Sequence, residues 1–83
     1  MHYTTSERIT VGVVYGDQGR MRPEWFVWEG REYRVASINH IWHDTAGRET
    51  LIFFSVSDKI DTYLLCYHTI QLQWTLCGVD MEG

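Results

Sequence analysis

Two small groups of metal-ligating side chains are present in the sequence. Cys66 and His68 are two positions apart, so in a strand their side chains lie on the same face. His40, His43 and Asp44 form a second group. A structural zinc ion needs four protein ligands, and neither group supplies them. We therefore interpret the histidines as ordinary surface histidines, and we predict no metal and no cofactor.

The only cysteines are Cys66 and Cys77, too few for a disulfide framework. In the register expected for the last two strands, Cys77 lies opposite Thr62, four positions along the strand from Cys66. At ~3.4 Å per residue this separation is on the order of 13 Å, too far for a disulfide or a shared ion.

Motifs for catalysis are absent from the sequence. There is no nucleophile elbow, no HExxH helix and no glycine-rich phosphate loop. The segment 16–19 has two glycines, but no strand–loop–helix unit follows, so it is predicted to be a turn. We predict no catalytic residue and no enzymatic activity. A small metal-dependent enzyme, assembled across strands, is the least favoured alternative.

Aromatic and arginine side chains alternate around residues 20–34, and this pattern can bind single-stranded nucleic acid. Trp25, Arg31 and Arg34 are the candidates for such contacts. However, acidic residues occupy the same stretch, and the whole chain carries a formal net charge of −4. Since phosphate binding depends on positive charge, nucleic acid is the alternative partner, not the favoured one.

The length and composition favour one small folded domain over residues 1–83. The chain has 83 residues, and 45% of them are hydrophobic, which argues against disorder. No apolar segment follows Met1, and no aliphatic or aromatic run is longer than that at 51–54. We therefore expect no signal peptide, no membrane association and a cytoplasmic location.

Hydrophobic residues alternate with a period of two along most of the chain, and no helical spacing lasts three turns. The predicted strands cover residues 8–15, 24–29, 31–42, 48–57, 61–68 and 71–79. The spacing predicts an all-β fold, a six-stranded antiparallel meander that curls into a small, half-open, SH3-like barrel. Residues 36–39 interrupt the alternation, so we expect a bulge where the third strand bends.

Two-residue turns at 29–30, 58–59 and 69–70 would set the register of three hairpins. The predicted cross-strand pairs are Phe26–Tyr33, Trp25–Arg34, Phe54–Tyr63, Ile52–Leu65, Leu65–Trp74 and Tyr63–Leu76. The apolar pairs share one face, which we assign to the core. Thr69 and Ile70 are poor turn residues, so the last turn is expected to be longer than two residues.

An apolar surface remains on the opposite face of the predicted sheet. If the third and fourth strands pair across residues 44–47, Ile38 lies beside Phe53, His40 beside Leu51, and Trp42 beside Glu49. The predicted contact residues on this face are Trp42, Leu51, Phe53 and Leu64. Monomers rarely leave such a patch in water, so either the first strand covers it or it binds a partner. We predict a homodimer, in a non-enzymatic interaction module.

Two segments resemble a family of small uncharacterised bacterial domains of unknown function. The first reads Pro23-x-x-Phe26-x-Trp28-x-Gly30-Arg31-x-Tyr33-x-Val35, followed by Trp42; the second reads Trp74-x-Leu76-x-x-Val79-Asp80. Some members of that family are encoded near DNA-repair polymerase genes, so the resemblance implies an accessory role in DNA repair. It supplies no catalytic residue. The strand over 8–15 and the acidic charge depart from the family pattern.

Overall fold

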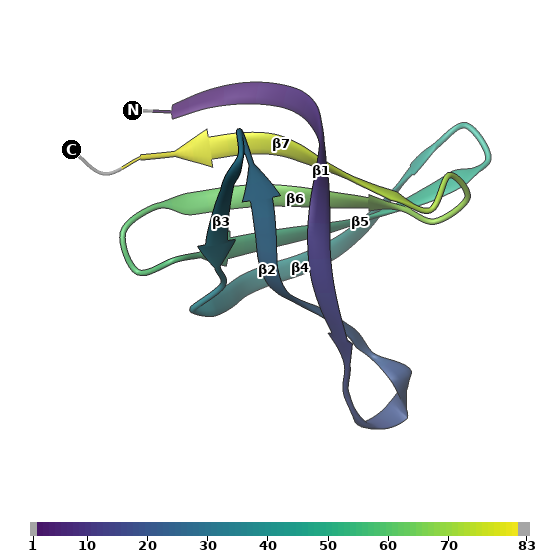
Figure 1. The fold of residues 1–83 in the computed structure, drawn as a ribbon. Coiled ribbons are helices and arrows are strands. Elements are labelled where there is room, and N and C mark those ends of the chain that lie inside the picture. The colour runs from purple at the N-terminus through teal and green to yellow at the C-terminus, as the bar shows by residue number, and fades with distance from the viewer. Residues whose placement is uncertain (1, 82–83) are drawn as a thin grey trace.

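Seven antiparallel strands form a single sheet in the computed structural model, which describes residues 2–81 (Figure 1). The strands are β1 (His2–Tyr15), β2 (Met21–Trp28), β3 (Arg31–Arg34), β4 (Ser37–Ala46), β5 (Glu49–Ser57), β6 (Thr62–His68) and β7 (Gln73–Asp80). One turn of 3₁₀ helix, η1 (Asp17–Gly19), lies between β1 and β2. Within residues 2–81, no helix is long and apolar enough to span a bilayer.

The sheet order is β3-β2-β1-β7-β6-β5-β4, so β1 and β7 pair in the middle and β3 and β4 form the two edges. β1 pairs with β7 through its first part and with β2 from Thr10 onward. Register shifts between Thr4 and Glu7 and between Gly12 and Val13 allow it to bend. As a result, β2 and β3 lie across one face of β4–β7 (Figure 1).

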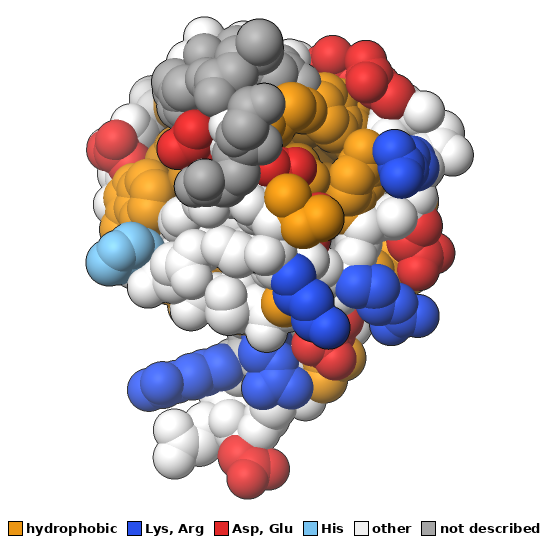
Figure 2. Space-filling view, turned by 90° about the vertical axis from the view of Figure 1, so that its left-hand side faces the viewer, with side chains coloured by type: hydrophobic (Ala, Val, Ile, Leu, Met, Phe, Trp, Pro, Cys, Tyr) orange, Lys and Arg blue, Asp and Glu red, His pale blue; other side chains and the backbone are white. Residues whose placement is uncertain are grey.

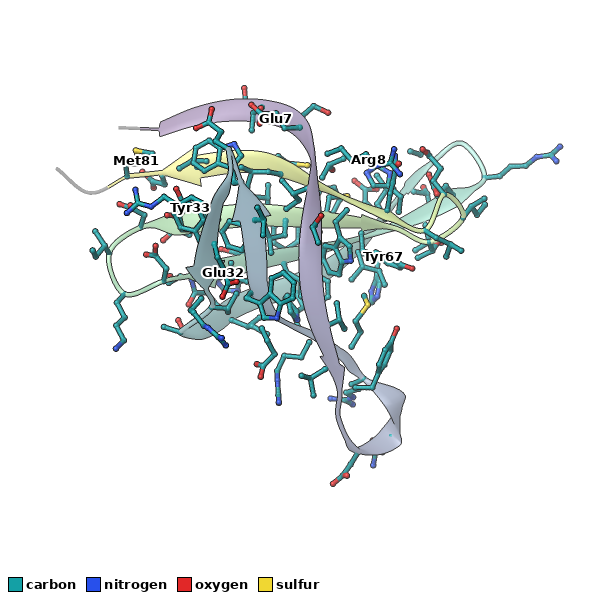
Figure 3. All side chains as sticks on the ribbon, in the orientation of Figure 1. Glu7, Arg8, Glu32, Tyr33, Tyr67 and Met81 are labelled. Atoms are coloured by element: carbon teal, nitrogen blue, oxygen red, sulfur yellow. The ribbon has the colours of Figure 1, made fainter. Side chains whose placement is uncertain are left out.

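The hydrophobic core lies between β1–β3 and this face of β4–β7, which we call the core face. Phe26 of β2 meets Tyr63 of β6 edge to face, with ring centroids 5.0 Å apart. Tyr33 of β3, which is labelled in Figure 3, stacks on Phe26 with ring centroids 5.2 Å apart. Leu65 and Leu76, from β6 and β7, are fully buried in the same cluster. Aromatic side chains of this size contribute most of the apolar area that a small domain can bury.

The all-β class and the antiparallel pairing of neighbouring strands are confirmed, but the six-stranded barrel is wrong. The predicted third strand, 31–42, is two strands, because the chain leaves the ladder at Val35 and Ala36. The Val35 amide donates to the Glu24 carbonyl and the Ala36 amide to the Ser57 carbonyl, so this connection joins β2 to β5. β3 and β4 are not paired with each other, and the sheet is not closed into a barrel.

The hairpin between β2 and β3 has the predicted register. Trp25 lies opposite Arg34 and Phe26 opposite Tyr33. Glu29 and Gly30 both have positive φ, at 52° and 75°, as a tight hairpin turn requires.

The other two predicted registers are wrong, by two residues between β5 and β6 and, between β6 and β7, by two from Leu65 onward and by three before it, where Tyr63 lies opposite Val79 instead of Leu76. Leu65 lies opposite Phe54 instead of Ile52, and it lies opposite Leu76 instead of Trp74. Both turns are longer than two residues, as expected for the last one. A shift of two preserves the face of every side chain, so the predicted core residues of β5–β7 still point inward.

Pro23 lies inside β2, whereas the sequence predicts that this strand starts at residue 24. It lies opposite Val13, directly at the register shift between β1 and β2. A bulge is one of the few places inside a sheet where a residue without an amide hydrogen is tolerated.

Candidate interaction surface

The face of β4–β7 that points away from β1–β3, here called the outer face, carries an exposed pair of aromatic rings. Trp42 of β4 lies directly opposite Phe53 of β5. The two rings stack with centroids 5.3 Å apart and an interplanar angle of 11°. Trp42 nevertheless leaves 41% of its surface exposed, because β4 is an edge strand and its other side has no neighbour within the sheet.

All four predicted contact residues lie on this outer face. Leu51 and Phe53 alternate with the core residues of β5, and Leu64 alternates with those of β6. Leu64 and Trp42 line a shallow groove of about 280 Å³, together with Thr4 and Cys77. Leu51, Phe53 and Leu64 are half-buried. The first strand does not cover this face, because β1 pairs edge to edge with β7.

The predicted pairing across β4 and β5 is wrong, because the turn is shorter than assumed. Gly47 and Arg48 form a two-residue turn closed by Ala46 and Glu49, and Gly47 has a φ of 65°. Trp42 therefore faces Phe53 instead of Glu49. Ile38 does not join the outer face: it lies opposite Val56 and packs against the core. A register shift between Ile38 and His40 changes which face the following residues occupy.

β4 is exposed on both faces. Every residue of this strand except Ile38 is exposed. Ile41, whose side chain lies on the core side, is 53% exposed because β1–β3 do not reach it. It borders an open cleft of about 550 Å³ that extends to Arg20 and Met21 at the start of β2. Sequence alternation alone does not reveal this exposure, since Ile41 has the pattern of a core residue.

A chain of polar groups crosses the outer face at the end of β5–β7 near the last turn. The Glu49 carboxylate accepts hydrogen bonds from the Ile70 and Gln71 amides, at 2.8 and 2.7 Å, and from the Gln71 side chain. The hydrogen bond from the Gln71 backbone amide lowers the pKa of Glu49. Desolvation acts in the opposite direction, and the bonds from the Gln71 side chain and the Ile70 amide lower the pKa further. His68 Nδ1 lies 3.6 Å from Glu49 Oε1, and His68 Nε2 lies 3.1 Å from the Thr75 hydroxyl.

The order carboxylate, imidazole, hydroxyl is that of a catalytic triad, but the geometry favours a structural role. Thr75 is only 8% exposed, and Glu49 is already bound to the backbone of the last turn. None of the grooves described above includes Thr75 among its lining residues. Sequence reasoning missed this cluster because Glu49 and Gln71 are far apart in the chain.

The two cysteines are much closer than predicted. The register shift between Leu64 and Leu65 brings Cys77 onto the outer face beside Cys66. Burial of Cys66, assisted by the neighbouring Cys77 thiol, raises the pKa of the Cys66 thiol to about 12. Both thiols are free, and the Cys77 sulfur lies 3.5 Å from the Thr75 hydroxyl. A thiol with so high a pKa is a poor nucleophile at neutral pH.

The histidines of β4 do not form a cluster with Asp44. His40 and Asp44 lie on the outer face with Trp42, whereas His43 lies on the other face with Ile41. Among the side chains that the structure describes, those of residues 4–81, no three His, Cys, Asp or Glu are grouped as a metal site would require.

The candidate nucleic-acid residues share the hairpin β2–β3 but do not form one site. Trp25 is half-buried, and its indole lies over Gly12 of β1. Arg31 stacks on the Tyr33 ring at 5.8 Å, and Arg34 pairs with Glu32 at 3.5 Å. Figure 2 shows Lys and Arg side chains interspersed with Asp and Glu side chains over the face of the molecule that it presents.

The chain matches no family model, no curated protein and no solved structure. The family resemblance of residues 23–80 therefore stays a prediction.

Proposed function

We propose that this protein is a non-enzymatic interaction module that forms a homodimer through the outer face around Trp42 and Phe53. The exposed aromatic stack carries the proposal. Trp42 and Phe53 are already held parallel, so little side-chain entropy is lost when a second surface covers them. Preorganised aromatic residues of this kind are enriched among the residues that dominate binding energy.

The composition of the surrounding face supports the same proposal. Leu51 and Leu64 extend the apolar surface on both sides of Phe53 along β5 and β6. Glu49 is hydrogen-bonded to the last turn, and His68 Nε2 lies 3.1 Å from the Thr75 hydroxyl, whereas His68 Nδ1 has no hydrogen-bond partner among the described residues. An interface whose centre is apolar loses little on desolvation where the polar groups around it are already paired, as Glu49 and Thr75 are here.

Sedimentation equilibrium of Phe53→Glu against wild type tests the proposal. We expect wild type to dimerise and Phe53→Glu to run as a monomer, because the variant places a charge in the centre of the interface. Ile60→Glu is the matched control: Ile60 is 69% exposed in the turn between β5 and β6, and the variant should dimerise normally. Wild type that stays monomeric at millimolar concentration would refute the proposed homodimer.

A further inference from the structure

The two edges of the sheet differ in how they are protected. β3 has four residues, Arg-Glu-Tyr-Arg, and its charges discourage another strand from pairing with it. β4 has ten residues, with no proline, no lysine and a single carboxylate, Asp44. Within the described sheet β4 pairs only with β5. An exposed edge of this length without protective charges is a place where another strand can add.

We propose that β4 is the element through which two copies of this chain meet, paired antiparallel with each other about a two-fold axis at Trp42. The inference rests on the proposed homodimer and names its contact. The two sheets then continue into each other, and the outer faces form one surface. The open cleft beside Ile41 leaves the approach to this edge free on the core side.

Symmetry restricts the register. In an antiparallel pair, residues directly opposite each other lie on the same face of the sheet. The two-fold axis must therefore lie midway between one residue and the same residue of the partner, because any other position would pair residues that point to opposite faces. With the axis at Trp42, the two Trp42 rings are opposite each other. His40 of each copy then faces the partner's Asp44, and Ile41 faces the partner's His43. The carboxylate of β4 therefore meets an imidazole at both ends of the contact.

The backbone favours this register too. The two-residue turn closes with Ala46 and Glu49, so alternate residues from Ala46 back to His40 bond toward β5. The residues between them, including Ile41 and His43, direct their amides and carbonyls to the free edge. In the proposed register Ile41 and the partner's His43 are opposite each other, so each can donate to the other's carbonyl.

The aromatic rings provide the apolar centre of the contact. Trp42 and Phe53 of one copy continue into Trp42 and Phe53 of the other, which gives a row of four rings across the axis. Leu64 lies on β6, two strands from the edge. Edge pairing therefore predicts that Trp42→Ala raises the dimer Kd strongly and that Leu64→Glu raises it only slightly. Packing of one outer face against the other predicts that both substitutions raise the dimer Kd strongly.

An exchange of charges tests the register directly. His40→Asp alone sets two pairs of carboxylates against each other, and Asp44→Lys alone sets lysine against histidine. Each variant should dimerise about tenfold more weakly than wild type. His40→Asp places like charges directly opposite each other, which destabilises a strand pair, and Asp44→Lys removes the carboxylate that faces His40. When the two variants are mixed, the introduced aspartate of one copy faces the introduced lysine of the other, and the native pair remains at the opposite end of the contact. We expect the heterodimer in a native mass spectrum of the mixture to exceed the proportion given by random exchange of subunits.

A proline variant tests the backbone contact. Ile41→Pro removes an amide hydrogen from the free edge only, and Ile41→Ala is the matched control that keeps it. Provided that circular dichroism shows both to be folded, we expect Ile41→Ala to dimerise and Ile41→Pro to be monomeric.

The outcomes separate the two proposals. A monomeric wild type overturns both. A dimeric wild type that is lost in Phe53→Glu, with only the heterodimer expected from random exchange of subunits and an unaffected Ile41→Pro, overturns edge pairing and leaves the homodimer in place. A heterodimer beyond the proportion expected from random exchange supports both proposals.

Discussion

Trp42→Ala is the most informative single substitution for the proposed dimer. Trp42 leaves 41% of its surface exposed. A large aromatic side chain has up to ~250 Å² of surface to bury, so roughly 100 Å² remains available to a partner. At about 25 cal/mol per Å², burial in both copies contributes about 5 kcal/mol to association. Because 1.4 kcal/mol is about tenfold in affinity, Trp42→Ala should raise the dimer Kd on the order of a thousandfold.

The variant also loses the stack on Phe53, which lowers the free energy of unfolding of each subunit by about 0.5–1.5 kcal/mol. Urea unfolding of dilute protein measures this separately from association. Sedimentation equilibrium over a range of concentrations gives the dimer Kd, and Ile60→Ala is the control for an exposed apolar side chain outside β4. Equal Kd values for Trp42→Ala and wild type would show that the exposed ring takes no part in association.

Three further predictions concern other parts of the molecule. A Cβ atom on Gly12 would lie 2.0 Å from the Trp25 indole, so Gly12→Ala should destabilise the fold by about 1–3 kcal/mol in urea unfolding, and Trp25→Leu should restore part of the loss. Burial opposes ionisation of Asp58, but the Asp61 and Ile60 amides and the Tyr63 hydroxyl donate hydrogen bonds to this carboxylate and lower its pKa. The ionised Asp58 therefore stabilises the fold at neutral pH, and this stabilisation is lost in acid. Wild type should therefore exceed Asp58→Asn in stability at pH 7 and lose that advantage as the pH falls below the ordinary carboxyl value of 3.8, whereas a gap that stays constant with pH would exclude this role. Labelled single-stranded DNA should not bind at low salt, since Trp25 covers Gly12 and Arg34 pairs with Glu32; binding that is lost in Arg34→Ala would restore the nucleic-acid alternative.

The faces of the strands could be predicted from the sequence, but the registers could not. Alternation with a period of two assigns Phe54, Tyr63 and Leu65 to the core whether the partner strand is shifted by two residues or not. The register depends on the turns, and these are fixed by side chains that alternation does not reveal. Asp58 accepts hydrogen bonds from the amides of its own turn, and Glu49 accepts from the amides of a turn some twenty residues away.

The candidate surface could be predicted only in part, for the same reason. Alternation assigns Trp42, Phe53 and Leu64 to the outer face, where they lie. It assigns Ile38 to the same face wrongly, because the register shift after Ile38 turns that side chain toward the core. The closeness of Cys66 and Cys77 depends on another shift, between Leu64 and Leu65. A shift of this kind is a property of two paired strands, so neither strand alone carries a signal for it.

The open edge at β4 follows from the order of the strands. Because the first and last strands pair at the centre of the sheet, the edges are β3 and β4, which are consecutive in the chain. The Val35 and Ala36 amides hold this corner to β2 and β5, but beyond it β4 continues along β5 while β3 has already ended. The chain thus has no strand left to pair with the far part of β4, where Ile41 and Trp42 are exposed. A second copy has a strand of matching length and complementary groups, which is why we assign it to this edge.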